Sequence, residues 1–196
     1  IWPLPTERTL LLPPPVALER FRNVGRSLRE RFGFREDDVV AAIVGRIQRR
    51  RRVTLFLEAL ARAREKLPYL KGLVIGRGTK RKSLVEEPIR RLGLEDSVVV
   101  GGYFEGDEYP AALASCDFGV YLAPGTDETA KALRELMALG KPVIAGRVGM
   151  LPELVEGRGV VVGLNAGDLA EAMVRLGRDG EVRERFGEEA ARFARE

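Results

Sequence analysis

Short apolar runs alternate with amphipathic stretches along the chain. The apolar runs are rich in β-branched residues and hydrophobic throughout, which is typical of strands buried on both faces of a parallel sheet. They predict strands at residues 39–44, 73–75, 98–100, 118–122, 143–145 and 160–162. Helical periodicity predicts helices at residues 24–32, 53–66, 82–92, 109–116, 129–139, 151–156 and 168–176, and a last helix from residue 181.

The repeated exchange of strand and helix determines the expected fold class. Strands joined through helices run parallel, with right-handed crossovers that place helices on both faces of the sheet. The sequence therefore predicts an α/β fold, a doubly wound, Rossmann-like parallel sheet of about six strands. In such a sheet, ligands bind beyond the carboxyl ends of the strands, where the strand order reverses.

The chain divides by composition into three parts. Residues 1–23 are rich in proline and are expected to form an interdomain linker, and residues 24–180 carry the alternating pattern of a domain. Residues 181–196 are expected to form a C-terminal helix that is truncated, because its pattern has no stop signal. Because the chain also begins without an initiator methionine, we expect it to be a piece of a longer protein.

Composition excludes several kinds of chemistry. The chain has 33 basic and 29 acidic residues, one cysteine and no histidine. A Ser-His-Asp triad, a Cys-His pair, a histidine base and a histidine-ligated zinc are therefore excluded within it. No run approaches the ~20 apolar residues of a membrane helix, and no secretory signal opens the chain. A cytoplasmic protein is expected.

Five arginines stand between the first predicted strand and its helix, in the sequence Arg46-Ile47-Gln48-Arg49-Arg50-Arg51-Arg52. Nucleic acid is one interpretation, but no aromatic residue for base stacking lies between Phe34 and Phe56. At the carboxyl end of a strand, guanidinium groups can instead bind a diphosphate together with helix amides. Arg46 and Arg51 are the two residues that we assign to a ligand, and the others are interpreted as solvated.

A second polar cluster surrounds the predicted start of the helix at residues 129–139. Asp127 and Glu128 can cap this helix, and Glu135 faces nearly the same side as Glu128. One interpretation is structural, a helix cap and a surface charge. The other is chemical, because helix-start amides suit phosphate and a carboxylate further along can accept hydrogen bonds from sugar hydroxyls. The combination resembles a nucleotide-sugar pocket.

Glycines follow the predicted strands, among them Gly76, Gly78 and Gly102. Glycine permits positive φ and close backbone approach, so these loops either shape a ligand site or turn the chain from strand to helix. The sequence Gly76-Arg77-Gly78 is neither a P-loop, since no Gly-Lys-Ser/Thr follows, nor a dinucleotide fingerprint, since its third glycine is missing. A phosphoryl-transfer NTPase is therefore not expected.

The order of these motifs resembles the C-terminal half of the group 1, retaining, GT-B-type glycosyltransferases over nearly the whole chain. Residues 39–60 read VVAAIVGRIQRRRRVTLFLEAL and match the family's strand, Gly-Arg pair, basic position and helix without gaps. Residues 73–78 read LVIGRG and are similar to the family's ivGdG. Residues 92–104 read LGLEDSVVVGGYF and are similar to the family's lgl.d.V.f.Gyv. Residues 135–144 read ELMALGKPVI and match EAmA.GkPVI, the most specific piece.

The resemblance implies one half of a GT-B fold that binds the sugar donor. In that family, residues at the positions of Arg46 and Arg51 hold the donor diphosphate, and the carboxylate at Glu135 binds the ribose hydroxyls. An acidic residue near the helix start contacts the transferred sugar; we assign it to Glu128, although counting back from Glu135 points to Asp127. Catalytic roles are thus expected for Glu128, Arg46 and Arg51. Donor binding is expected for Glu135, Asp127, Gly76, Gly78, Gly102, Tyr103, Thr129, Ala130 and Lys131.

Two departures from the family pattern affect this site. The family's Lys-Gly pair is replaced by Arg51-Arg52, which keeps the charge but loses a glycine. The usual Gly-Phe-Gly after the acidic residue reads Thr129-Ala130-Lys131, in which Lys131 can add a phosphate contact.

The expected function is donor binding in a retaining transferase that moves a hexose from a UDP- or GDP-sugar. An upstream domain of the same protein would bind the acceptor and make any peripheral membrane contact, so the isolated fragment is expected to be inactive. Neither a metal nor another cofactor is expected, and nucleic acid is not an expected partner. Two alternatives stay open: a nucleotide-sugar epimerase or hydrolase of the same architecture, and a non-catalytic module that binds RNA or an acidic partner.

Overall fold

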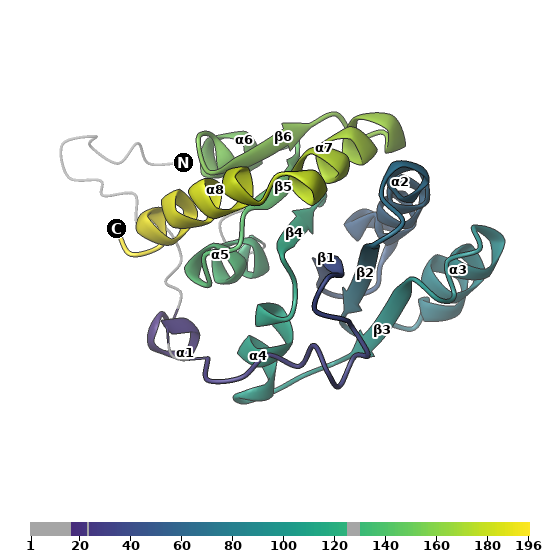
Figure 1. Ribbon diagram of the computed structural model, residues 1–196, viewed down its shortest axis with the longest axis horizontal. Helices are drawn as coiled ribbons and strands as arrows, with labels where there is room; N and C mark the ends of the chain where they lie inside the picture. Colours follow the sequence, from purple (N-terminus) through teal and green to yellow (C-terminus); the bar gives the residue numbers. More distant parts are fainter. Residues whose placement is uncertain (1–16, 23, 125–129) are drawn as a thin grey trace, which may run out of the picture.

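The computed structural model describes residues 17–22, 24–124 and 130–196. Its centre is a sheet of six parallel strands in the order β3-β2-β1-β4-β5-β6 (Figure 1). The strands are β1 (Val39–Val44), β2 (Leu70–Ile75), β3 (Val98–Gly102), β4 (Phe118–Tyr121), β5 (Val143–Gly146) and β6 (Gly159–Val162). Each predicted strand is present, and the predicted doubly wound, Rossmann-like fold is confirmed.

Helices join the strands and lie on both sides of the sheet (Figure 1). They are α1 (Glu19–Arg22), α2 (Val53–Lys66), α3 (Glu87–Arg91), α4 (Glu108–Ala114), α5 (Lys131–Ala138), α6 (Leu151–Val155), α7 (Ala166–Arg178) and α8 (Gly180–Phe193). A 3₁₀ turn (Arg49–Arg51) precedes α2. No helix in the described parts of the chain is long and apolar enough to cross a membrane.

The side chains of β1 alternate between two hydrophobic cores. Ala41 and Ile43 belong to a first core covered by α2, α3 and α7. Val40, Ala42 and Val44 belong to a second core covered by α1, α4, α5 and α6. This period of two is what a strand buried on both faces requires, and it explains why the run is apolar at every position.

The C-terminal helix α8 packs against both cores. Asp179 caps it, because its carboxylate accepts a hydrogen bond from the Val182 amide at 2.9 Å. Val182 and Phe186 pack against the first core, whereas Ala190 lies in the second. The helix expected from residue 181 is therefore an integral part of the packed domain.

The helix predicted at residues 24–32 is wrong, because residues 24–27 have no regular secondary structure and residues 28–33 form a bend and turns. The Leu28 amide donates to Ser115 Oγ at 2.8 Å. The Leu28 amide therefore does not donate to the carbonyl four residues earlier, as an α-helix requires. The Arg29 guanidinium donates to the Asp117 carboxylate at 3.0 Å and ties the same segment to the start of β4. Long-range hydrogen bonds thus override the local helical pattern.

The helix predicted at residues 82–92 is present but changes its winding. A π-helical turn (Lys82–Glu86) leads into α3. Pro88 has no amide hydrogen and cannot bond to the Leu84 carbonyl four residues earlier. Thr54 Oγ1, from α2, donates to that carbonyl at 3.1 Å instead. A side chain of the neighbouring helix thus satisfies the group that the proline leaves open.

Candidate functional site

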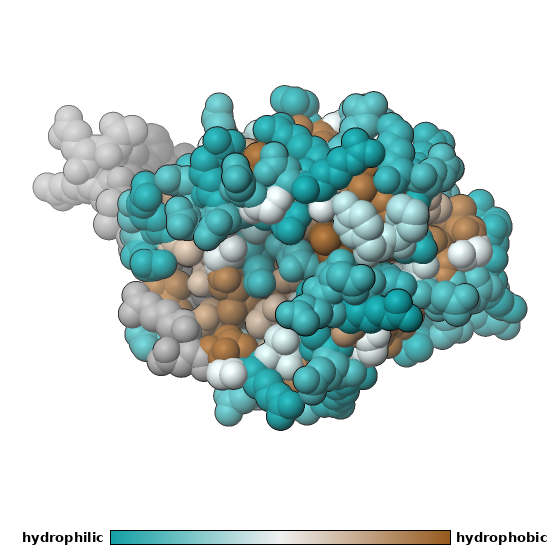
Figure 2. Space-filling view, in the orientation of Figure 1, coloured by the Kyte–Doolittle hydropathy of each residue, from teal (hydrophilic) through white to brown (hydrophobic). Residues whose placement is uncertain are grey.

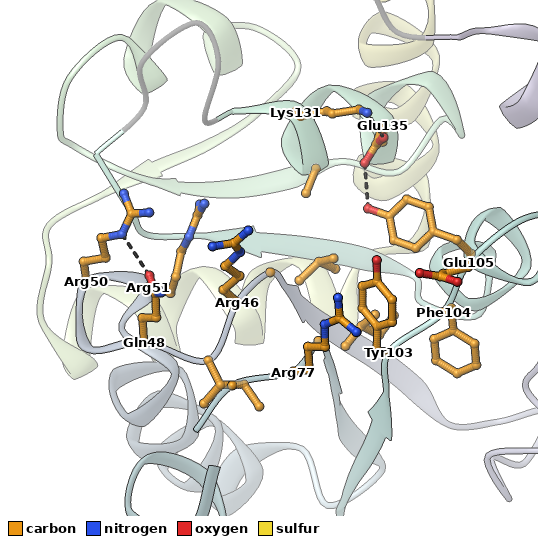
Figure 3. Close-up of a pocket in the computed structure, with 18 of the residues that line it drawn as sticks. Arg46, Gln48, Arg50, Arg51, Arg77, Tyr103, Phe104, Glu105, Lys131 and Glu135 are labelled. Carbon is orange, nitrogen blue, oxygen red and sulfur yellow. Dashed lines mark hydrogen bonds and ion pairs between the residues drawn. The ribbon is translucent and has the colours of Figure 1, made fainter. Parts of the chain in front are cut away.

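A cavity of about 1050 Å³ opens at the carboxyl end of the sheet. The loops after β1, β2 and β3 and the first turns of α5 form its wall. The strand order reverses between β1 and β4, so the cavity lies at the switch point where doubly wound sheets bind ligands. Arg46, Arg51 and Glu135 all line it (Figure 3). These three residues therefore share one space, although they come from separate parts of the sequence.

Backbone contacts hold the loops of the cavity floor together. The Gly76 amide donates to the Gly102 carbonyl at 2.6 Å. Gly76 has a φ of +144°, and a Cβ at this position would lie 1.9 Å from the Gly45 carbonyl oxygen. A Cβ at Gly78 would lie 2.4 Å from the Ile47 carbonyl oxygen. Packing between the loops therefore requires glycine at these two positions, whatever ligand the cavity takes.

The Arg51 guanidinium is held by a tyrosine of β4. Arg51 Nη1 donates to Tyr121 Oη at 2.6 Å, and the guanidinium carbon lies 5.6 Å from the centroid of that ring. Arg51 Nε is buried and has no hydrogen-bond acceptor among the described residues. The exposed Arg46 guanidinium projects into the cavity beside Arg51 (Figure 3). Two cations thus face the same space, and one has a fixed orientation.

Arg52 stands where the family pattern has glycine, and its backbone shows why glycine suits the position. Its φ is +55°, which makes it the one non-glycine residue with positive φ in the described part of the chain. Arg52 Nη1 donates to the Leu122 carbonyl at 2.6 Å. This hydrogen bond offsets part of the strain that a left-handed conformation imposes on a residue with a Cβ.

Glu135 is a buried carboxylate, with 5% of its surface exposed. Tyr109 Oη donates to Glu135 Oε2 at 2.6 Å, and Lys131 Nζ lies 3.8 Å from Oε1. Burial, together with the adjacent Glu135 charge and this hydrogen bond, raises the pKa of Tyr109 far above its usual value. Tyr109 therefore stays a neutral donor. Because a carboxylate accepts up to about four hydrogen bonds, Glu135 can accept more from a ligand.

The predicted site residues fall into three groups. Seven of them line the cavity: Arg46, Arg51, Gly76, Gly78, Tyr103, Lys131 and Glu135. Gly102 and Ala130 lie next to the wall, where Gly102 turns the chain at the end of β3 with a φ of +87° and Ala130 is fully buried before α5. Asp127, Glu128 and Thr129 lie outside the described residues, so their roles stay predictions.

The sequence did not predict a role in the site for five other residues of the wall: Arg20, Arg50, Arg77, Glu105 and Tyr109. The position of Arg77 just beyond a predicted strand was an available signal, because such positions meet at the ligand-binding edge. Tyr109 and Tyr121 carried no such signal. They lie 26 and 70 residues from the side chains that they bind.

Among the described residues of this wall, cationic side chains outnumber carboxylates. The cations are Arg20, Arg46, Arg50, Arg51, Arg77 and Lys131, and the carboxylates are Glu105 and Glu135. Such an excess favours a ligand with several negative charges, because guanidinium groups bind phosphate oxygens through charge-assisted hydrogen bonds. Within the described ranges, no three His, Cys, Asp or Glu residues are grouped as metal ligands would be.

A doubly wound parallel sheet with an arginine-rich cavity at its switch point is typical of α/β domains that bind ligands beyond the carboxyl ends of their strands. Comparison with known families makes the assignment specific. The family described as glycosyl transferases group 1 matches residues 25–193. The chain belongs to the group 1 glycosyltransferases, and its fold is one half of the GT-B arrangement.

Curated relatives and solved structures agree with this family. The chain is 30% identical over 167 residues to an alpha-D-kanosaminyltransferase of Streptomyces kanamyceticus, and this alignment covers 84% of this chain and 42% of that protein. It is 31% identical over 201 residues to a D-inositol 3-phosphate glycosyltransferase of Kribbella flavida, and this alignment covers 92% of this chain and 45% of that protein. The chain thus spans less than half the length of these two relatives.

The fold is also similar to that of Anabaena HepE, whose structure was solved in complex with UDP and glucose. The TM-score is 0.79 at 23% sequence identity, and the match covers 92% of this chain and 50% of HepE. This structural likeness supports the fold alone, independently of the family assignment.

Proposed function

We propose that this chain is the C-terminal, donor-binding domain of a retaining glycosyltransferase. It binds a UDP- or GDP-sugar, and an upstream domain of the same protein binds the acceptor to which the hexose is transferred. The observation that carries the proposal is the convergence of Arg46, Arg51 and the buried Glu135 on one cavity. A nucleotide sugar offers matching groups, a diphosphate for the arginines and ribose hydroxyls for the carboxylate.

In this proposal the arginines act on the leaving group. Cleavage of the bond between sugar and diphosphate leaves negative charge on the diphosphate oxygens. Arg46 and Arg51 neutralise that charge as it develops, so they stabilise the transition state more than the bound donor. Removing one such contact raises the barrier by about 3 kcal/mol. These guanidinium groups supply the positive charge for which other transferases use a metal ion, so we propose that none is required.

Glu135 fixes the nucleoside end of the donor. Its side chain is held by Tyr109 and Lys131, so its free acceptor sites point in a defined direction. Two adjacent ribose hydroxyls can donate to one carboxylate, which positions the diphosphate relative to the arginines. The proposed contact between Glu128 or Asp127 and the transferred sugar rests on the family resemblance.

The two-domain part of the proposal is supported by the lengths of the relatives. The chain covers 42% of the kanosaminyltransferase and 50% of HepE. A donor domain alone lacks acceptor contacts, so this chain should bind donor without transferring sugar. With the whole protein, a retaining enzyme yields the anomeric configuration of its donor. Inversion, an epimer or free sugar as the product would reject retaining transfer.

Isothermal titration calorimetry with UDP, GDP and their sugar conjugates tests the proposal on the 196-residue chain. We expect a nucleoside diphosphate to bind, and both Arg46→Ala and Glu135→Gln to weaken it at least tenfold. Arg192→Ala, an exposed arginine of α8 outside the cavity, is the matched control and should leave affinity unchanged. No binding of any nucleoside diphosphate at millimolar concentration, with circular dichroism confirming the fold, would overturn the proposal.

A further inference from the structure

Tyr103 is unusually exposed for a large aromatic side chain. Tyr103 and Tyr69 are the two large hydrophobic residues that count as exposed among those described, and 51% of the Tyr103 surface is accessible. On the face shown in Figure 2, hydrophilic residues cover much of the surface. Unlike Tyr69, Tyr103 lines the cavity. Its exposed ring is therefore part of the ligand site, and an aromatic ring at such a site is a platform on which a base can stack.

The Arg77 guanidinium lies directly on the Tyr103 ring. Its central carbon is 3.9 Å from the ring centroid, which is van der Waals contact. Arg77 follows β2 and Tyr103 follows β3, and the register pairs Ile75 with Gly102, so the two side chains emerge side by side. A stacked guanidinium uses its face for the ring and keeps its N–H donors at its edge. Arg77 is thus oriented to bind acceptors that lie near its own plane.

The cavity has two chemically different ends. Arg50, Arg51 and Arg46 lie toward one end, and Tyr103, Glu105 and Glu135 toward the other (Figure 3). A nucleoside diphosphate with its phosphates on the arginines and its ribose at Glu135 places its base between Arg77, Tyr103 and Glu105. This placement rests on the proposed function.

Bases differ in what they offer to Arg77. Guanine presents two adjacent acceptors, O6 and N7, which an arginine binds in a bidentate manner, whereas adenine pairs N7 with a donating amino group. Uracil has single carbonyl acceptors separated by an N–H donor. Because arginine has donors only, guanine alone among these bases can accept two parallel hydrogen bonds from the guanidinium group.

Glu105 complements the opposite character of the same base. Its exposed carboxylate lines the same end of the cavity and has no hydrogen-bond or ion-pair partner among the described residues. A carboxylate only accepts hydrogen bonds, and the N1–H and 2-amino groups of guanine are donors. Arg77 also replaces the acidic residue of the family's ivGdG pattern, so the acceptor at that position has become a donor. We propose that Arg77, stacked on Tyr103, is a specificity-determining residue that selects guanine, and that the donor is a GDP-sugar.

Calorimetry of the 196-residue chain with GDP, IDP, ADP and UDP tests this selection. A bidentate contact discriminates between bases by about 5- to 150-fold. We expect GDP to bind at least fivefold more tightly than ADP and UDP. IDP keeps O6 and N7 but lacks the 2-amino group, so it should retain a preference over ADP. This comparison separates recognition of the base edge from general purine stacking.

Variants of Arg77 identify the residue that carries the preference. Arg77→Ala should lower GDP affinity at least fivefold more than UDP affinity, and Arg77→Lys should do the same because it keeps the charge without the fork. Arg158→Ala is the matched control, since that guanidinium lies 3.8 Å from the Phe193 ring but outside the cavity. It should leave the preference unchanged.

The outcomes distinguish this inference from the proposed function. Equal affinity for the four diphosphates, a preference for UDP, or an Arg77→Ala effect that is the same for all of them would overturn guanine selection and leave donor binding intact. Failure of every diphosphate to bind would overturn both.

Discussion

Replacing Gly76 with alanine tests whether the cavity depends on the contact between the loops after β1 and β2. The new Cβ would lie 1.9 Å from the Gly45 carbonyl oxygen. Unstrained contacts of a carbon atom lie at roughly 3.5 Å. The two loops must therefore separate by more than about 1 Å, or Gly76 must leave its φ of +144°, which L residues rarely adopt.

The free-energy cost follows from what that movement disturbs. The Gly45 amide donates to the Ile75 carbonyl at 2.9 Å, and the Gly76 amide donates to the Gly102 carbonyl at 2.6 Å. Each such bond contributes about 1 kcal/mol. Overpacking and an unfavourable φ each add about 1–3 kcal/mol. With partial relaxation, we expect the free energy of unfolding to fall by about 3–6 kcal/mol, a large share of the 5–15 kcal/mol typical of a domain.

Gly102→Ala provides the matched control. Gly102 also has a positive φ, +87°, but a Cβ there would meet nothing within 4 Å. It should therefore lose only the conformational part, about 1–2 kcal/mol. Urea denaturation followed by circular dichroism measures both variants, with unchanged m-values as the test of a two-state comparison. If Gly76→Ala is no less stable than Gly102→Ala, the argument from loop packing fails.

Three further predictions concern stability. Arg52→Gly should be more stable than Arg52→Ala by about 1 kcal/mol in urea denaturation, because both lose the bond to Leu122 but only glycine relieves the positive φ; equal stability would contradict this. Burial raises the pKa of Cys116 to about 12 from 9.0, so the unfolded chain releases this proton first and the free energy of unfolding falls as pH rises from 9 to 12. The Cys116→Ala variant should lose less stability than the unaltered chain over that pH range. An identical pH dependence of the two proteins would contradict a raised pKa of Cys116 as the cause. Thr54→Val removes the donor to the Leu84 carbonyl and should cost about 1 kcal/mol, with faster hydrogen exchange in the π-helical turn; unchanged exchange would contradict it.

The sequence predicts most of this fold because burial on both faces leaves a simple signature. Residues 39–44 are apolar throughout, and β1 has the predicted bounds. β2 begins three residues before its predicted start. The prediction started too late because Lys71 interrupts the apolar run, although the Lys71 backbone still pairs with Val40. The Lys71 ammonium group reaches the Asp96 carbonyl at the sheet's edge at 3.2 Å, so its charge is accommodated. Periodicity thus locates a strand better than it locates the strand's ends.

The candidate site could be predicted only in part, since sequence shows which residues follow a strand but not how neighbouring strands align. Arg46 lies two residues after the end of β1, and its place at the ligand-binding edge can be predicted without knowing the strand register. The meeting of Arg77 and Tyr103 depends on the pairing of Ile75 with Gly102, which comes after an irregularity in the ladder between β2 and β3. A one-residue change of register would separate these side chains.

Orientation of the charged groups is what the sequence could not reveal, and tyrosines supply it. Of the chain's four tyrosines, three hold a charged side chain of the cavity. Tyr109 and Tyr121 do so through their hydroxyl groups, whereas Tyr103 does so through its ring. A tyrosine has few rotatable bonds, so it fixes a long arginine or glutamate at a small entropic cost. Groups oriented before a ligand arrives lose less freedom on binding and are already placed where charge develops during reaction. The tyrosines therefore contribute to the proposed activity although none of them need carry charge.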